Sequence, residues 1–313
     1  MSAQANARGI RLMSLAMSAF MANDAIVKTL STALPVGQLV LVRGLIATTI
    51  VVLAGRTRSP HAAMASGRPT WTARTVGLVS LRGFLDALAT LAYMTSLFHM
   101  PLANAAAINM AAPLFVTLFA AVLLKARVRA LGWLATGAGF LGVLLIIQPR
   151  PDSFNGWGWL CLAGTVVQAS RDLLTQRIPR QVPSQIITLV TAGSVTLSGG
   201  LLALAQDMQP LAVRELALMA GAGAFIAIGY HLLIIATRAG DPAVVAPFRY
   251  SGLLLALALG WLLWDQVPNA LAWVGIVMLL SAGAYLLRTL RSDPTQTEPD
   301  QDHPMRAPGR PDR

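Results

Sequence analysis

Charged residues are scarce in this sequence. Of its 313 residues only 12% are Asp, Glu, Lys or Arg, whereas 55% are hydrophobic. Soluble domains of ordinary composition carry about 25% charged residues, so this composition excludes a typical soluble protein. A helix needs about 20 mainly apolar residues to cross the hydrocarbon core of a bilayer, and the scarcity of charge leaves room for many such stretches.

Cysteine, histidine and catalytic motifs are also scarce. Cys161 is the only cysteine, which excludes an intrachain disulfide and a cysteine cluster for a metal ion. The sequence has four histidines and contains no glycine-rich phosphate loop, no HExxH and no GxSxG. These absences argue against a membrane-embedded enzyme, and the lack of an ATP-binding motif argues against a primary pump. We therefore expect neither a cofactor nor a metal site, and a channel stays open as an alternative.

Ten long apolar stretches, joined mostly by short loops, make up most of the chain. They predict an all-α polytopic membrane protein with ten transmembrane helices. The first stretch follows Arg8 and Arg11, as a signal peptide would, but its length, its internal charges and the nine later stretches predict a retained helix. The approximate spans are 10–31, 37–55, 75–98, 102–124, 130–148, 156–176, 184–205, 213–237, 242–264 and 270–288.

The net charge of +11 is unevenly distributed along the chain. With a cytoplasmic N-terminus at residues 1–9, most Lys and Arg fall on the cytoplasmic side, and only Arg150 and Arg214 fall outside. This bias predicts an inner-membrane protein with both termini in the cytoplasm, and it argues against a nucleic-acid partner. The cytoplasmic set is Arg8, Arg11, Arg56, Arg58, Arg68, Arg74, Lys125, Arg127, Arg129, Arg177, Arg180, Arg238, Arg288, Arg291, Arg306, Arg310 and Arg313.

Two segments differ from the apolar stretches. Residues 56–74 form a basic linker that contains Pro60 and Pro69, and we expect it to be mobile. Residues 292–313 are rich in proline and acidic residues and nearly free of apolar ones, which predicts a disordered cytoplasmic tail.

An internal repeat is visible when the chain is slid along itself. A slide of 148 residues places Asp24 over Asp172, and a slide of 137 places Tyr93 over Tyr230. A slide of 138 places "NAAAINMAAPLF" over "PAVVAPFRYSGL". These matches predict two halves of five spans each, and an odd number of spans inverts the second copy. Inverted repeats are typical of secondary transporters, in which the substrate site lies between the halves near mid-membrane. The halves are residues 10–148 and 156–288.

The ten-span layout, the arginine in "LVLVRGLIA", and the stretches "YMTSLFHMPLANAAAINMAAPLF" and "YHLLIIATRAGDPAVVAPFRY" resemble the drug/metabolite transporter superfamily, in particular its EamA-type carriers. "NDAIVK" followed by "P..QLVLVRG" is similar to a subgroup with carriers for riboflavin and for S-adenosylmethionine. The resemblance covers residues 8–290 and implies a carrier of small polar metabolites. The family often has Glu at the ends of the fourth and ninth spans, where this chain has Lys125 and Asp265, so no role is transferred to Lys125.

Eight ionisable side chains lie within the apolar stretches. Each costs roughly 2.5 to 3.5 kcal/mol at the centre of a helix on insertion scales, so a retained one usually faces a partner or a wet cavity. Lys28 and Asp172 lie near span ends, where a long or terminal side chain can reach the membrane surface. The eight are Asp24, Lys28, Arg43, Arg82, Asp86, Arg171, Asp172 and Arg249.

Helix rise predicts which of these charges lie at the same depth. Asp24 and Arg43 both come out about 21 Å from the cytoplasmic face of a core about 30 Å thick. Arg82, Arg171 and Arg249 come out about 10 Å deep, which predicts a basic layer.

Asp86 follows Arg82 by one helical turn on the same face, and Asp172 is the acid nearest in depth to Arg171. Two interpretations stay open: buried salt bridges that fix helix packing, or a polar cavity that opens by turns to each side.

In the cavity interpretation, the bases outnumber the acids by five to three. The excess favours a substrate with carboxylate, phosphate or electron-rich carbonyl groups, because guanidinium groups present planar forks of donors. An aspartate at mid-depth can also bind and release a proton, since desolvation favours its neutral form and a nearby arginine favours its charged form. Asp24 and Asp86 are the candidates for such coupling.

Further candidates for substrate contact are polar or aromatic side chains within the spans. Tyr93 and Tyr230 occupy equivalent places in the two halves and either stack on a planar substrate or belong to an interfacial belt. Pro113 and Pro247 predict a kink in the fourth and ninth spans. Runs of glycine and alanine predict close helix packing or the seam of a homodimer. Asn109 and Tyr250 complete the candidate site with Asp24, Arg43, Arg82, Asp86, Tyr93, Arg171, Tyr230 and Arg249.

Overall fold

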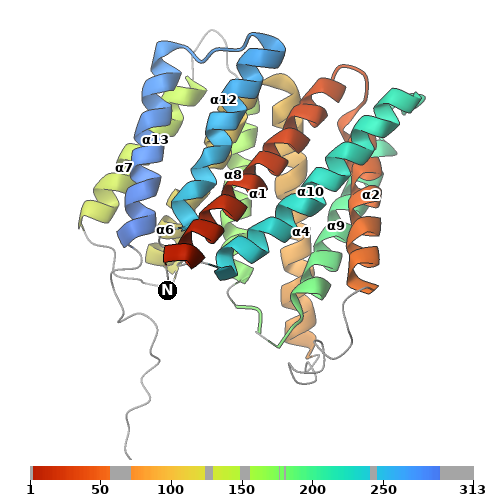
Figure 1. Cartoon of the computed structure of the whole chain (residues 1–313), viewed down its shortest axis with the longest axis horizontal. Coiled ribbons are helices and arrows are strands. Elements are labelled where there is room, and N and C mark those ends of the chain that lie inside the picture. The colour runs from red at the N-terminus through yellow and green to blue at the C-terminus, as the bar shows by residue number, and fades with distance from the viewer. Residues whose placement is uncertain are drawn as a thin grey trace, which may run out of the picture.

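The structure, a computed structural model, describes residues 3–56, 72–123, 130–148, 156–175, 177–179, 181–239 and 245–289. Within these ranges it is helical and contains no β-strand (Figure 1). Each predicted span holds a helix. The helices are α1 Ala3–Leu30, α2 Val36–Arg56, α4 Ala73–His99, α5 Leu102–Asn109, α6 Ala112–Leu123, α7 Ala130–Ile147, α8 Gly156–Thr175, α9 Ser184–Ala203, α10 Val213–Ala239, the 3-10 helix η1 Ala246–Tyr250, α12 Ser251–Trp264 and α13 Ala270–Thr289.

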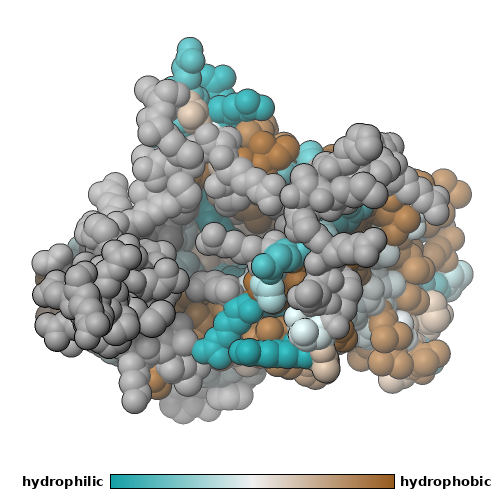
Figure 2. Space-filling view, turned by 90° about the horizontal axis from the view of Figure 1, so that it is seen from below, coloured by the Kyte–Doolittle hydropathy of each residue, from teal (hydrophilic) through white to brown (hydrophobic). Residues whose placement is uncertain are grey.

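The lengths and apolar sequences of these helices fit a membrane. Seven helical stretches of the described residues are long and apolar enough to cross a bilayer, and two shorter apolar helices end the second half. With α8, which carries Arg171 and Asp172, they account for the ten spans. Hydrophobic residues are visible along the side of the bundle and hydrophilic residues at the end seen from below (Figure 2). The ten-helix membrane fold predicted from the apolar stretches is therefore confirmed.

The fourth and ninth spans are interrupted, as their prolines predict. In the fourth span α5 ends at Asn109 and α6 begins at Ala112, one residue before Pro113. In the ninth span Pro247 lies in η1, which precedes the regular helix α12. Proline removes a backbone donor and clashes with the preceding turn, which explains both interruptions. The two halves therefore share an irregular fourth helix.

The helix contacts repeat when the two halves are exchanged. α1 packs along α10, and its counterpart α8 packs along α4. Likewise α2 contacts α10 as α9 contacts α4, and α1 contacts α12 as α8 contacts α6. Two further contacts, α2 with α9 and α7 with α13, each join a helix to the equivalent helix of the other half. α7 and α13 lie side by side at one edge of the bundle (Figure 1). This pattern is that of two inverted five-helix repeats.

Glycine permits the closest of these approaches, between α7 and α13. An added Cβ at Gly142 would lie 2.6 Å from the carbonyl oxygen of Gly275, and one at Gly275 would overlap the carbonyl oxygen of Gly142. Small residues let membrane helices pack backbone to backbone, and here they do so within one chain.

Several sequence predictions concern segments at the ends and in the linker. α1 already begins at Ala3, so the predicted N-terminal segment 1–9 is helical from that residue onward. The tail 292–313 and residues 57–71 of the linker lie outside the described residues.

Candidate functional site

Four polar side chains from α1, α2 and α4 form a hydrogen-bonded group inside the bundle. The Tyr93 hydroxyl donates to Asp24 Oδ2 at 2.8 Å, and Asn23 Nδ2 donates to Asp24 Oδ1 at 2.8 Å. Arg43 Nη1 donates to Asn23 Oδ1 at 3.0 Å. All four side chains are buried. We call Asn23, Asp24, Arg43 and Tyr93 the buried cluster.

Asp24 and Arg43 therefore come together as their depths predict, but without a direct salt bridge. The Asn23 amide lies between them, taking a hydrogen bond from the guanidinium and giving one to the carboxylate. Burying a charge is costly unless hydrogen bonds and a counter-charge compensate it, and this chain supplies both. The buried cluster links the first three spans of the first half.

Lys28 has a different environment from the one that its position near a span end suggests. Its Nζ donates to the backbone carbonyls of Leu97 at 3.1 Å and Met100 at 2.7 Å, where α4 ends. It also lies 5.9 Å from the ring centre of Trp264 at the end of α12. Cations are favourable at helix C-termini, whose last carbonyls lack partners. Lys28 is buried, joins α1 to the end of α4 and does not reach out to the membrane surface.

A second polar group lies where α4, α8 and α9 meet. Arg171 of α8 forms both of the salt bridges found among the described residues, one to Asp86 of α4 and one to its neighbour Asp172. Its Nη2 and Nε lie 2.7 Å and 3.0 Å from Asp172 Oδ1, and its Nη1 donates to Asp86 Oδ1. We call Arg82, Asp86, Arg171 and Asp172 the arginine cluster.

The partner of Arg82 differs from the one considered in the sequence. Its Nε donates to Thr175 Oγ1 at 2.9 Å and its Nη1 donates to Thr191 Oγ1. Asp86, one turn along α4, is bound to Arg171 instead. The salt bridge considered between Arg82 and Asp86 therefore does not form among the described residues. Asp86 pairs with Arg171 of the second half instead, because α8 packs directly against α4.

Tyr230 of α10 interacts with charged groups of both clusters. It interacts electrostatically with Arg43 of the buried cluster and with Arg82, Asp86 and Arg171 of the arginine cluster. Its ring meets Phe20 of α1 edge to face, with ring centres 5.1 Å apart. Tyr230 is nevertheless 43% exposed. The Tyr230 ring is therefore accessible while its hydroxyl interacts with groups of both clusters.

The remaining predicted site residues lie apart from these clusters. Arg249 is exposed on η1 and makes no side-chain hydrogen bond or ion pair with the described residues, so it does not join Arg82 and Arg171 in the arginine cluster. Tyr250 places its hydroxyl against Gly283 of α13. Asn109 is half-buried at the end of α5, next to the interruption of the fourth span.

The comparison with known families decides what kind of protein this is. The model of the EamA-like transporter family matches residues 7–148 and matches again over residues 155–289. The chain belongs to the EamA-like transporter family. Each matched segment covers five of the ten spans, so each half of the chain is one copy of the family domain.

Similar proteins in this transporter family are named for different substrates. The chain is 29% identical to the pseudopaline exporter CntI of Pseudomonas aeruginosa over 90% of this chain and 96% of the exporter. It is 32% identical to a riboflavin transporter of Rhizobium johnstonii over 66% of this chain and 68% of that protein. It is 23% identical to an S-adenosylmethionine uptake transporter of Rickettsia bellii over 66% of this chain and 71% of that protein. The subgroup indicated by "NDAIVK" is therefore confirmed.

A solved structure supports the fold of this EamA-like chain. One crystal structure superposes with a TM-score of 0.60 over 93% of this chain and 98% of the other, at 19% sequence identity. At this identity the likeness concerns the fold alone.

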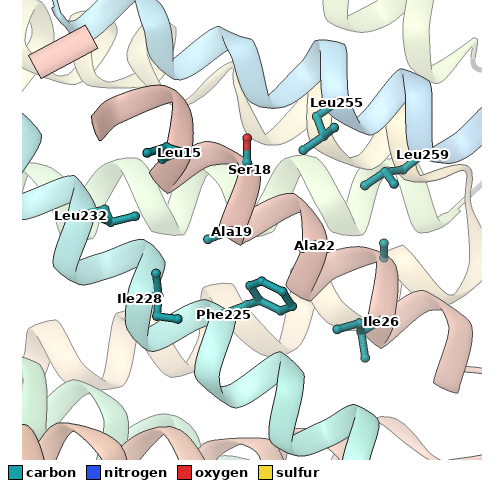
Figure 3. A pocket seen from close by; sticks show the side chains of 11 residues that line it. Leu15, Ser18, Ala19, Ala22, Ile26, Phe225, Ile228, Leu232, Leu255 and Leu259 are labelled. Carbon is teal, nitrogen blue, oxygen red and sulfur yellow. The ribbon is translucent and has the colours of Figure 1, made fainter. Parts of the chain in front are cut away.

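An apolar groove lies between α1, α10 and α12 (Figure 3), and none of its lining residues belongs to either cluster. It has a volume of about 590 Å³, and Phe225, Ile228 and Leu259 are among its lining residues. Ser18 is the polar side chain in this lining, and its hydroxyl already donates to the Ser14 carbonyl at 2.9 Å. A polar molecule would find almost no hydrogen-bonding partner there, so the two clusters are the better candidate for a transport site in this family member.

Thr175 and Thr191 were not predicted as members of the site. Thr175 and Thr191 hold Arg82, yet threonine is common in membrane helices and carries no charge to mark it. The usable signal is that Thr175 lies four residues, about one helical turn, after Arg171 and therefore on the same face of α8.

Proposed function

We propose that this EamA-family protein is a secondary carrier that moves a small polar organic metabolite across the inner membrane by alternating access. The observation that carries the proposal is the polar path along the seam between the halves. The path runs from the buried cluster past Tyr230 to the arginine cluster and contains six of the eight ionisable side chains found within the spans. Polar groups at this depth are costly, and a passage for a polar molecule accounts for their presence.

Unequal closure of the two ends supports alternating access. At the end where α1 and α4 finish, Lys28 binds the last carbonyls of α4 and the buried cluster lies beneath it. Toward the other end, 36% of the Asp172 side chain is exposed. In inverted repeats an exchange of the two halves' conformations converts such a state into the oppositely open one.

The substrate that we test first is riboflavin, with S-adenosylmethionine as the alternative. A guanidinium such as that of Arg82 donates to the carbonyl oxygens of a flavin, and the exposed Tyr230 ring gives a planar molecule a surface to stack on. Relatives named for export and for uptake both align with this chain, so transport has to be measured in both directions.

Proteoliposomes test the carrier directly. Vesicles preloaded with unlabelled riboflavin are diluted into labelled riboflavin, and the uptake is followed with time and concentration. The same assay is run with S-adenosylmethionine and with amino acids. A carrier gives saturable uptake that is accelerated by preloading, whereas flux that rises linearly with concentration indicates a channel. Chemical conversion of the labelled compound inside the vesicles would indicate an enzyme.

The orientation belongs to the same proposal. We expect both termini on the cytoplasmic side of the inner membrane, because the basic residues gather there. Cysteines placed singly at Asn6 and Gln209 in a Cys161→Ala background test this with a membrane-impermeant maleimide. Labelling at position 209 alone in intact cells is expected, and labelling at position 6 alone would reverse the orientation.

A further inference from the structure

We infer that the seam selects metabolites that carry no net charge and that offer both a hydrogen-bond acceptor and a hydrogen-bond donor or cationic group. This inference rests on the proposed carrier function and names the substrate class of the same site. Zwitterions and neutral heterocycles both meet the requirement.

The structure changes the charge balance of the site. Within the spans the sequence has five basic and three acidic side chains, an excess of two bases. In the structure two of the bases, Lys28 and Arg249, lie outside the clusters. Lys28 is used at the end of α4, and Arg249 is exposed on η1 away from the clusters. The charges that remain in the two clusters are three arginines and three aspartates, namely Arg43, Arg82, Arg171, Asp24, Asp86 and Asp172.

A balanced site disfavours a charged passenger. Within the low-dielectric bundle each added charge needs a counter-charge, and an uncompensated one costs several kcal/mol. An anion would leave an excess of negative charge at the seam and a cation an excess of positive charge. A neutral or zwitterionic molecule adds neither.

Two side chains of the arginine cluster still have hydrogen-bonding capacity. Arg82 uses Nε and Nη1 on the hydroxyls of Thr175 and Thr191, which are neutral, and a guanidinium has five N–H donors. Arg82 is half-buried and can therefore take an acceptor group such as a carboxylate or a carbonyl.

Asp172 provides the complementary function. Its Oδ1 is bound by Arg171, while 36% of its side chain is exposed and Oδ2 makes no hydrogen bond with the described residues. That oxygen accepts an N–H or O–H group, or lies near a cationic one. Arg82 and Asp172 thus present one donor site and one acceptor site at the same end of the seam.

Two matched pairs of compounds test the rule of zero net charge. Riboflavin is compared with flavin mononucleotide, which adds an anionic phosphate, and S-adenosylhomocysteine is compared with S-adenosylmethionine, which adds a cationic sulfonium. Binding to the purified full-length protein is measured by equilibrium dialysis. We expect the neutral member of a pair to bind at least about tenfold more tightly, because the charged member lacks a counter-charge.

Charge variants of the protein sharpen the test. Asp172→Asn leaves one positive charge in excess, so the preference for riboflavin over flavin mononucleotide should fall by about tenfold. Asp207→Asn, the same change in an exposed loop between α9 and α10, should leave the preference unaltered.

The inference is wrong if neither neutral compound binds, if the charged member of a pair binds more tightly, or if Asp172→Asn and Asp207→Asn give the same ratio. Neutral preference in dialysis without counterflow in vesicles would leave the inference standing and contradict the carrier function.

Discussion

Asp24 and Asp172 coincide when the chain is slid along itself by 148 residues, yet their surroundings in the structure differ. Asp24 is buried and accepts hydrogen bonds from Tyr93 and Asn23, and no cation contacts it within salt-bridge distance in the described residues. Asp172 is 36% exposed on its side chain and binds Arg171 directly. The two aspartates thus differ both in exposure and in partner.

The sequence repeat therefore predicts the position of each aspartate along its helix. The packing of the helices determines which residues each aspartate contacts. In a carrier built of inverted repeats, the environments of Asp24 and Asp172 are expected to approach each other's when the seam opens to the other side.

The largest expected effect tests the closed side. Arg43→Ala removes the guanidinium that compensates Asp24, so transport should fall at least about a hundredfold while the protein still inserts, because a buried charge loses its counter-charge. Counterflow in proteoliposomes measures the loss, and Arg214→Ala, an exposed arginine at the start of α10, is the control. Full activity in Arg43→Ala would remove Arg43 from the site.

The next effect concerns the contact between the halves. Gly142→Ala places a Cβ 2.6 Å from the Gly275 carbonyl oxygen, so the free energy of unfolding should fall by about 1 to 3 kcal/mol through overpacking. Gly137→Ala on the same helix meets no atom within 4 Å and should stabilise by about 0.5 to 1 kcal/mol. Unfolding of the purified protein in detergent compares the two, and equal stabilities would contradict the close approach of α7 and α13.

A smaller effect is expected at the closed end. Lys28→Met keeps the length of the side chain but leaves the carbonyls of Leu97 and Met100 without their donor, which should cost about 1 to 2 kcal/mol. Arg11→Met, an exposed change on the same helix, should stay within about 0.5 kcal/mol of the unsubstituted protein. Thermal unfolding measures both, and an unchanged Lys28→Met would show that the closed end does not depend on this bond.

The smallest effect distinguishes Tyr93 from Tyr230, which the slide of 137 residues aligns. Tyr93→Phe removes a donor to Asp24 and should cost about 1 kcal/mol, seen as a severalfold loss of transport. Tyr230→Phe keeps the exposed ring and removes a hydroxyl that makes no hydrogen bond with the described residues, so its effect should be smaller. Initial rates of counterflow for the two variants decide, and a larger loss in Tyr230→Phe would reverse the assignment.

Much of the fold was predictable because membrane spans obey simple length and polarity rules. Each of the ten apolar stretches contains helix in the described residues, and Pro113 and Pro247 mark the two interrupted spans. Helix rise also predicted that Asp24 and Arg43 lie at the same depth, because depth along a helix follows from the residue number.

The choice of contact partners was not predictable in the same way. Depth does not say which face of a helix meets which neighbour, so the bridging role of Asn23 and the pairing of Asp86 with Arg171 needed the packing of α8 on α4. Lys28 lies near a span end by count, but the end of α4 lies beside it and offers bare carbonyls. The neighbouring helix, and not the position in the sequence, therefore determines that Lys28 is a buried cap of α4 rather than a surface residue.

The exchange of contacts between the halves also bears on how this protein is made. The most extensive helix contacts all join a helix of the first half to one of the second: α1 to α10, α7 to α13, α2 to α9 and α4 to α8. During synthesis the first five spans enter the bilayer before these partners exist. Their packing faces are therefore exposed to lipid until the second half is inserted. The buried cluster, whose residues all lie in the first half, can form before that point, whereas the arginine cluster needs α8 of the second half.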